Sequence, residues 1–176
     1  MDALVRIDAA LLDAIRGLPH PDCLNGVFVL ASMVGVGGLI WLTAGAVLAL
    51  TRQIPLRGML RLLLAIALVH GVVDLGLKPL VGRQRPAPPD EIQLRLIERP
   101  ATASFPSGHA ANAFAGALVI TRLWPKGRFV VWAAAVIVAV ARVYLGVHYP
   151  LDAVAGVLVG LVIGWIALHA RVPSRR

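Results

Sequence analysis

The sequence has little cysteine, few aromatic residues and few acidic residues, and each shortage excludes a class of protein. Cys23 is the only cysteine, so the chain has no internal disulfide and no second thiolate for a zinc or redox motif. The 17 basic and 9 acidic residues give a formal net charge of +8, but aromatic residues make up only 6% of the chain. The basic residues also lie in short clusters between apolar segments. We therefore expect no nucleic-acid partner and attribute the positive charge to membrane topology and anion binding.

Long apolar segments dominate what remains. Hydrophobic residues make up 59% of the chain, charged residues 15%, and the mean hydropathy is +0.81. These values lie outside the usual range of soluble domains. The composition therefore predicts an integral membrane protein with the bilayer as its partner.

We predict an all-α fold, namely a polytopic membrane helix bundle of about five transmembrane helices in a single domain over residues 1–176. An apolar run of roughly 20 residues is long enough to span a bilayer as a helix. The run over residues 107–123 is the shortest and is rich in Ala and Gly, which predicts a helix packed inside the bundle. The five predicted spans cover about residues 24–50, 59–77, 107–123, 129–147 and 151–170.

Residues 1–20 precede these spans and have a different pattern. Asp2, Arg6, Asp13 and Arg16 share one arc of a helical wheel, and most apolar residues lie elsewhere. This pattern predicts an amphipathic helix at the membrane interface. Acidic residues stand where a secretory signal would have a basic leader, so we expect the helix to be retained.

Basic residues between the predicted spans indicate the orientation of the chain. Three clusters fall on one face if the chain has five spans, and the positive-inside rule makes that face cytoplasmic. The long connection over residues 79–106 would then be an extracytoplasmic loop, with Arg95 and Arg99 available to screen headgroups or gate entry. The clusters are Arg52, Arg57 and Arg61; Arg122, Lys126 and Arg128; and Arg171, Arg175 and Arg176.

Three short polar motifs interrupt the apolar segments between residues 78 and 152. Ionisable groups beside membrane helices are costly to desolvate, so they mark functional sites. With five spans, all three motifs lie on the extracytoplasmic face, where they can converge. The motifs are Lys78-x6-Arg85-Pro86, Pro106-Ser107-Gly108-His109 and Arg142-x5-His148-x3-Asp152.

These residue types suit the binding of a phosphoryl group. Lys78, Arg85 and Arg142 provide an ammonium and two guanidinium groups for phosphate oxygens. Ser107 can cap a helix that begins there, and Gly108 allows the helix N-terminus to approach an anion closely. The motifs therefore predict a phosphate-transfer site at a bilayer surface.

Two histidines and a carboxylate add the groups needed for catalysis. His148 and Asp152 are four residues apart, so the carboxylate can fix the tautomer of the imidazole. One of His109 and His148 could attack phosphorus while the other protonates the leaving oxygen. His70 and Asp74 share a helix face with Lys78, and a structural polar pair is as good an interpretation of them as a catalytic one.

The three motifs resemble those of the type 2 phosphatidic acid phosphatase superfamily. The resemblance implies that Lys78, Arg85, Ser107, Gly108 and Arg142 bind phosphate, without a metal or another cofactor. It also implies that His109 is the general acid and that His148 is the nucleophile, forms a phosphohistidine and is oriented by Asp152. One position departs from the family pattern, because Ala141 stands where the family has serine before the arginine of the third motif.

The resemblance implies a membrane lipid phosphatase, with a lipid phosphate as substrate. Small size and a Gly- and Ala-rich composition favour a bacterial plasma membrane, and a site facing outward favours undecaprenyl diphosphate or another polyprenyl phosphate. Phosphatidate and phosphatidylglycerophosphate are the alternatives. An anion-binding transporter is the non-enzymatic alternative, although it has no need of paired histidines and the sequence has no inverted repeat. The oligomeric state is open.

Overall fold

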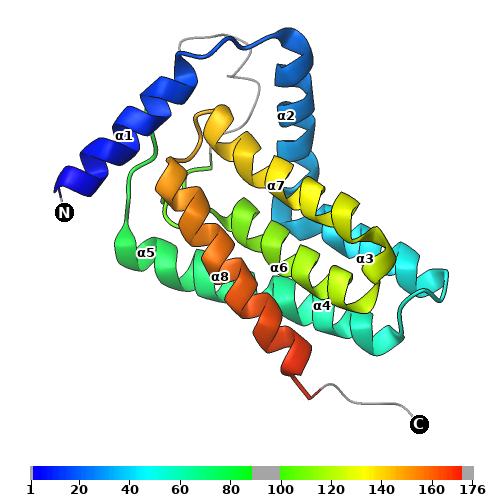
Figure 1. The fold of residues 1–176 in the computed structure, drawn as a ribbon. Coiled ribbons are helices and arrows are strands. Elements are labelled where there is room, and N and C mark those ends of the chain that lie inside the picture. The colour runs from blue at the N-terminus through cyan, green and yellow to red at the C-terminus, as the bar shows by residue number, and fades with distance from the viewer. Residues whose placement is uncertain (1, 89–99, 172–176) are drawn as a thin grey trace.

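The computed structural model describes residues 2–88 and 100–171, and these residues form helices and connecting segments with no strand among them (Figure 1). The predicted all-α fold is therefore confirmed for the described residues. The α-helices are α1 (Asp2–Arg16), α2 (Asp22–Val34), α3 (Leu39–Leu50), α4 (Leu56–Val69), α5 (Lys78–Val81), α6 (Gly108–Leu123), α7 (Arg128–Tyr144) and α8 (Pro150–His169).

Helix α6 lies at the centre of the bundle, as its Ala- and Gly-rich sequence predicted. It contacts α3, α4, α7 and α8. On α8, a Cβ added at Gly156 or Gly160 would collide with the backbone of α6, and one at Gly164 would lie 3.0 Å from the Ala115 carbonyl oxygen. Small residues thus let the two helix backbones approach closely, as is typical of membrane helix pairs.

Within residues 2–88 and 100–171, three helical segments are long and apolar enough to cross a bilayer. They are Leu56–Val81 with 26 residues, Pro125–Tyr144 with 20 and Pro150–His169 with 20, and the bent pair Asp22–Val34 and Val36–Leu50 makes up to four. Helix α6, with 16 residues, is shorter than these. The exact number of five spans stays a prediction.

The first apolar run is not one straight helix. It is bent by 57° between α2 and the segment that begins at Val36. Gly37 and Gly38 at the break have φ angles of 57° and 76°, values that favour glycine. Gly38 packs closely against Ile66, because a Cβ added there would lie 2.8 Å from Ile66 Cδ1. The glycine pair also breaks the helix.

The second apolar run continues further than predicted. After α4 the chain forms a π-helix over His70–Leu77 and then α5, so the connection begins at Gly82 rather than at residue 79. Pro79 is the second residue of α5 and lies within this continuous helical segment. Within the predicted loop, Arg95 and Arg99 lie outside the described residues, as do Arg175 and Arg176 of the third basic cluster.

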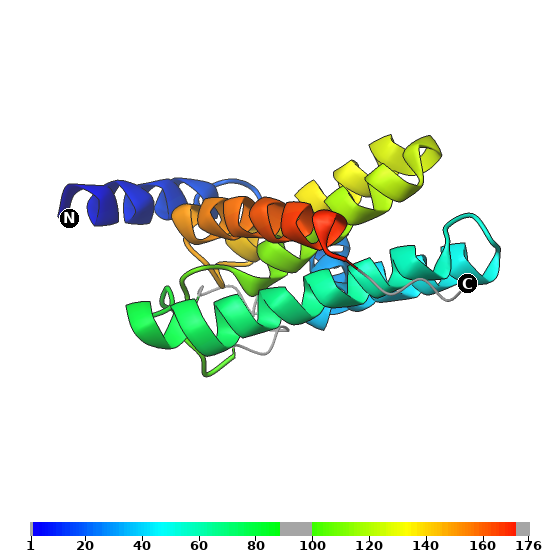
Figure 2. The same cartoon turned by 90° about the horizontal axis from the view of Figure 1, so that it is seen from below.

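Helix α1 packs across the ends of α7 and α8 rather than within the bundle (Figures 1 and 2). Leu12 is 1% exposed and packs with Val143 and Ala153. Leu4, Ile7 and Leu11 are exposed, so an apolar face remains outside the protein core. The structure therefore has a helix at the predicted place, and its position at a membrane interface stays a prediction.

The bundle separates the polar motifs from the described basic clusters. The C-terminal ends of α3, α6 and α8 lie at one end of the bundle (Figure 1). The N-terminal ends of α6 and α8 lie at the other end. Figure 2 shows the connections after α3 and α6 at the end opposite α1. The end nearest α1 holds the candidate site.

Candidate functional site

A cavity of about 260 Å³ lies where the three motifs meet. The structure brings Lys78, Arg85, Gly108, His109, Arg142 and His148 to its walls, and Ser107 and Asp152 support it from buried positions. The remaining lining residues are Gly37, His70, Asp74, Pro100, Thr102 and Asn112. Residues that are far apart in the sequence thus form one concave, positively charged site.

The π-helical segment and α5 position the ammonium group of Lys78. Lys78 Nζ donates to Asp74 Oδ1 at 2.6 Å, and Asp74 Oδ2 lies 2.7 Å from His70 Nδ1. The three side chains therefore line up on one face, as their spacing predicted. Lys78 is 8% exposed, and pairing with Asp74 offsets the cost of burying its charge.

The second motif forms the start of α6. Ser107 is the N-cap, and its hydroxyl accepts from Ala110 N–H at 3.4 Å, as predicted. A Cβ at Gly108 would lie 3.5 Å from Asp74 Oδ1 and 3.6 Å from Lys78 Nζ, so this residue lies in contact with the Asp74–Lys78 pair. The Ser107 N–H donates to the Asp152 carbonyl oxygen at 2.9 Å and joins the second motif to the third.

A tight turn after α7 positions His148. The Val147 and His148 N–H groups both donate to the Arg142 carbonyl oxygen at 3.1 Å, so the chain folds back on the end of α7. Gly146 has a φ of 63° within this turn. The turn fixes Arg142 and His148 relative to each other, with both side chains 2% exposed. The neighbouring Ala141 side chain is fully buried in the core.

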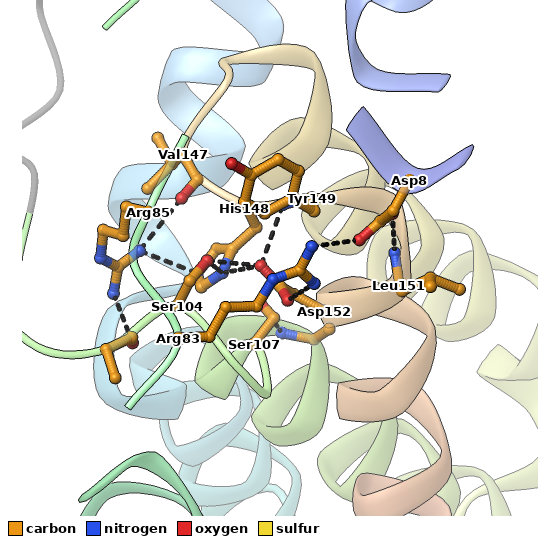
Figure 3. Close-up of polar contacts among 12 residues, drawn as sticks. Asp8, Arg83, Arg85, Ser104, Ser107, Val147, His148, Tyr149, Leu151 and Asp152 are labelled. Carbon is orange, nitrogen blue, oxygen red and sulfur yellow. Dashed lines mark hydrogen bonds and ion pairs between the residues drawn. The ribbon is translucent and has the colours of Figure 1, made fainter. Parts of the chain in front are cut away.

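His148 uses its two ring nitrogens differently (Figure 3). Nδ1 lies 3.5 Å from Asp152 Oδ2 and 3.4 Å from Ser104 Oγ, whereas Nε2 lies 3.2 Å from Arg85 Nη1. Because a guanidinium group can only donate, Nε2 is the acceptor and Nδ1 carries the proton. The Nε2 lone pair therefore points toward Arg85, and it becomes available for attack when Arg85 turns to another acceptor.

The environment keeps the His148 ring neutral. Burial lowers the pKa of His148 to about 4, and the positive charges of Arg142 and Arg85 act in the same direction. The hydrogen bond with Asp152 opposes this shift. A neutral imidazole at physiological pH is the form that can act as a nucleophile.

Asp152 is fully buried and uses both carboxylate oxygens. Oδ2 accepts from the Tyr149 N–H at 3.0 Å and from the Ser104 hydroxyl, and Oδ1 accepts from Arg83 Nη1 at 2.6 Å. Figure 3 shows these donors around the carboxylate. Multiple donors hold a carboxylate in one orientation.

The two guanidinium groups at the cavity have further contacts with the protein. Arg85 donates through Nε to the Thr102 carbonyl oxygen at 2.8 Å and through Nη1 to the Val147 carbonyl oxygen at 3.2 Å. Arg142 Nη1 donates to the Ser32 hydroxyl. These contacts point the cations into the site before any anion is bound.

His109 occupies another wall of the cavity and is half-buried. Its Nε2 has no hydrogen-bond partner among the described residues. A Cβ at Gly35 would lie 3.3 Å from His109 Cδ2, so the lack of a side chain at Gly35 leaves room for the ring. An imidazole nitrogen is therefore free to exchange a proton with a bound group.

Sequence reasoning missed three residues of this site: Ser104, Arg83 and Asp8. Ser104 and Arg83 lie in irregular segments, where no periodicity predicts their direction. Asp8 did leave a signal, because it falls among the apolar residues of α1 rather than in the polar arc. A carboxylate on an apolar face needs a partner.

Comparison with known proteins identifies relatives of this chain. A family profile described as PAP2 superfamily matches residues 58–176. An undecaprenyl-diphosphatase from Sulfolobus acidocaldarius is 33% identical over 150 residues, which cover 83% of this chain and 70% of that protein. A decaprenylphosphoryl-5-phosphoribose phosphatase from Mycobacterium tuberculosis is 37% identical over 176 aligned residues, covering 93% of this chain and 85% of that protein.

A solved structure has a similar fold. The crystal structure of a transmembrane PAP2 type phosphatidylglycerolphosphate phosphatase from Bacillus subtilis matches with a TM-score of 0.76 and 25% sequence identity. The match covers 96% of this chain and 86% of that one. The likeness therefore extends over nearly the whole bundle.

Proposed function

Because the chain belongs to the PAP2 superfamily, we propose that it is an integral membrane lipid phosphatase that works through a phosphohistidine at His148. The observation that carries this proposal is the environment of His148. Its Nε2 lone pair lies at a cavity that Lys78, Arg85 and Arg142 also line, while its Nδ1 faces a fixed carboxylate. Anion binding alone needs the cations but not this histidine.

The first chemical step is attack of His148 Nε2 on phosphorus. A bond forms between Nε2 and phosphorus as the bond from phosphorus to the leaving oxygen breaks, and Asp152 stabilises the positive charge that develops on the ring. The leaving oxygen is the bridging oxygen of a diphosphate, which departs with the lipid monophosphate, or the lipid oxygen of a phosphomonoester. Lys78, Arg85, Arg142 and the α6 N-terminus hold the phosphate oxygens. Arg85 Nη1 moves from Nε2 to a phosphate oxygen when the substrate enters.

The second group in this step is His109. The negative charge of the bound phosphate favours a proton on its ring, and that proton passes to the leaving oxygen. Water then gives a proton back to His109 and attacks the phosphohistidine. This step breaks the bond between phosphorus and nitrogen, releases inorganic phosphate and restores His148. No metal ion or other cofactor takes part in this scheme.

The position of the cavity relative to the membrane suits a lipid substrate. We place the cavity at the extracytoplasmic face because Arg52, Arg57, Arg122, Lys126 and Arg128 lie at the opposite end of the bundle. The charged headgroup reaches the cations at the bilayer surface while the lipid chain stays in the hydrocarbon. Residues 1–20 would lie along the same surface.

We favour a polyprenyl phosphate or diphosphate such as undecaprenyl diphosphate as the substrate. The Sulfolobus and Mycobacterium relatives carry names of polyprenyl-linked phosphatases, and an outward-facing site suits the recycling of a carrier lipid. Phosphatidylglycerophosphate is the second candidate, because the Bacillus subtilis structure of the same fold is named for it. Phosphatidate presents the same phosphomonoester chemistry.

The test is release of inorganic phosphate by the purified protein in detergent with excess EDTA. Undecaprenyl diphosphate, phosphatidylglycerophosphate and phosphatidate are compared side by side, and we expect the highest kcat/KM for the diphosphate. His148→Ala should abolish release while substrate binding persists, and vanadate should inhibit the wild-type protein as a mimic of five-coordinate phosphorus. Folded protein that binds these lipids without releasing phosphate would instead support an anion-binding transporter.

A further inference from the structure

Helix α1 has a fully buried carboxylate that the two chemical steps above do not use. Asp8 is 0% exposed, its Oδ2 accepts from Arg83 Nη2 at 2.6 Å and its Oδ1 accepts from the Leu151 N–H at 2.9 Å. A buried carboxylate is strongly destabilising without such partners. Both oxygens of Asp8 are thus committed to residues beside the candidate site.

Arg83 connects this carboxylate to Asp152. Its guanidinium donates through Nη2 to Asp8 and through Nη1 to Asp152 Oδ1, each at 2.6 Å, and it lies 4.0 Å over the Tyr149 ring (Figure 3). Burial alone would lower the pKa of Arg83, but the hydrogen bond to Asp8 and the charge of Asp152 raise it. The guanidinium is therefore a charged bridge between two buried carboxylates.

The bridge acts on the oxygen of Asp152 that faces away from His148. Oδ2 serves Ser104, Tyr149 and His148, whereas Oδ1 contacts Arg83. Without the Arg83 contact, Oδ2 keeps its donors but no other described residue holds Oδ1, so rotation of the carboxylate about its Cβ–Cγ bond is less restricted. Rotation would change the contact of Oδ2 with His148 Nδ1 and so the direction of the Nε2 lone pair.

We propose that Asp8 and Arg83 are positioning residues for phosphate transfer, acting in series through Asp152 on His148. This inference rests on the proposed function. It makes α1 a structural part of the active site as well as a candidate interfacial helix. Packing of Leu12 against α7 and α8 holds Asp8 next to Arg83. In addition, Arg16 Nη2 donates to the Ala87 carbonyl oxygen at 2.6 Å, so α1 contacts the segment between Arg83 and Ala87 at both of these residues.

The test measures kcat and KM for Asp8→Asn, Arg83→Met and the double variant in detergent. Arg83→Met should lower kcat about 10-fold to 100-fold, the usual effect of losing a residue that orients a reacting group, with KM unchanged. Asp8→Asn should lower kcat less, because Arg83 keeps its contact with Asp152. The double variant should be no slower than Arg83→Met, since residues acting in series are not additive.

Asp13→Asn is the matched control. It removes a carboxylate from the same helix, but the Asp13 side chain is 73% exposed and lies 3.9 Å from Arg16. We expect wild-type kcat and KM. Arg83→Lys, which keeps the charge but not the two-pronged contact, should have a kcat between those of the wild type and Arg83→Met, and it provides a second measurement if Arg83→Met fails to fold.

Three results would overturn the inference while leaving the phosphatase proposal intact. The first is unchanged kcat in folded Asp8→Asn and Arg83→Met. The second is a rise in KM alone, which would make Arg83 a substrate-binding residue. The third is independent, additive losses in the double variant. An inactive wild-type protein would instead contradict the proposed function, so the two failures are distinguishable.

Discussion

Replacing Ser104 by alanine tests whether the buried hydroxyl beside Asp152 contributes to catalysis. The Ser104 side chain is fully buried, donates to Asp152 Oδ2 and lies 3.4 Å from His148 Nδ1. It does not line the cavity. The variant should therefore change the rate of phosphate transfer rather than the binding of substrate.

The size of the effect follows from the hydrogen bond that is lost. A hydrogen bond to a charged group contributes about 1.5–3 kcal/mol. If that energy is expressed fully in the transition state, in which the His148 ring becomes positive and depends on Asp152, kcat falls about 10-fold to 150-fold. The KM should stay at its wild-type value.

The assay is steady-state phosphate release from a saturating lipid substrate in detergent, with folding checked by thermal unfolding. Thr121→Val is a matched control, because the Thr121 hydroxyl donates to the Ala117 carbonyl oxygen at 2.8 Å within α6, away from the cavity. The control should retain wild-type kcat. An unchanged or increased kcat in Ser104→Ala would refute the reasoning, because it would show that Asp152 is oriented without this hydroxyl.

Three further predictions follow from the geometry. Nitrogen-15 NMR of labelled histidine should show that the His148 ring is neutral, with the proton on Nδ1, until the pH falls through about 4. Protonation of the ring near 6.5, the ordinary pKa of histidine, would contradict this prediction. Asp74→Asn keeps an acceptor oxygen but removes the negative charge that pairs with Lys78 Nζ, so KM should rise about 2-fold to 5-fold, as a loss of about 0.5–1 kcal/mol gives. An unchanged KM would mean that the charge of Asp74 does not position Lys78. Gly160→Ala should reduce the free energy of unfolding by about 1–3 kcal/mol, because its methyl group would collide with the α6 backbone. Gly26→Ala, where a Cβ meets nothing within 4 Å, should cause no such loss in a thermal unfolding assay.

Much of the fold and the cavity could be predicted because both depend on regular patterns. Apolar runs long enough to span a bilayer predicted the helices. Because successive spans run in opposite directions, their order predicted that the three motifs lie at one end of the bundle. The line of His70, Asp74 and Lys78 was also predictable, since residues four apart share a helix face. The π-helical form of that segment was not, because its side-chain spacing reads as an ordinary helix.

The parts that the sequence did not predict depend on tertiary contacts. The contacts of Ser104 and Arg83 depend on how two irregular segments run side by side, where the Ser104 N–H donates to the Arg83 carbonyl oxygen at 2.8 Å. The partner of Asp8 is 75 residues away in the sequence. The bend after α2 follows from two consecutive glycines with positive φ, whose conformation a straight apolar run conceals. Such features can be recognised only when the path of the backbone through the fold is known.

The most direct test of the proposed mechanism is to trap the covalent intermediate. Wild-type protein is mixed with substrate carrying radioactive phosphorus in the transferred phosphate, quenched in alkali, which preserves phosphohistidine, and digested for peptide mapping. The mechanism predicts a label on the peptide that contains His148, absent in His148→Ala. Turnover with a label on another residue, or with no covalent label at any time, would contradict the assignment of His148 as the nucleophile.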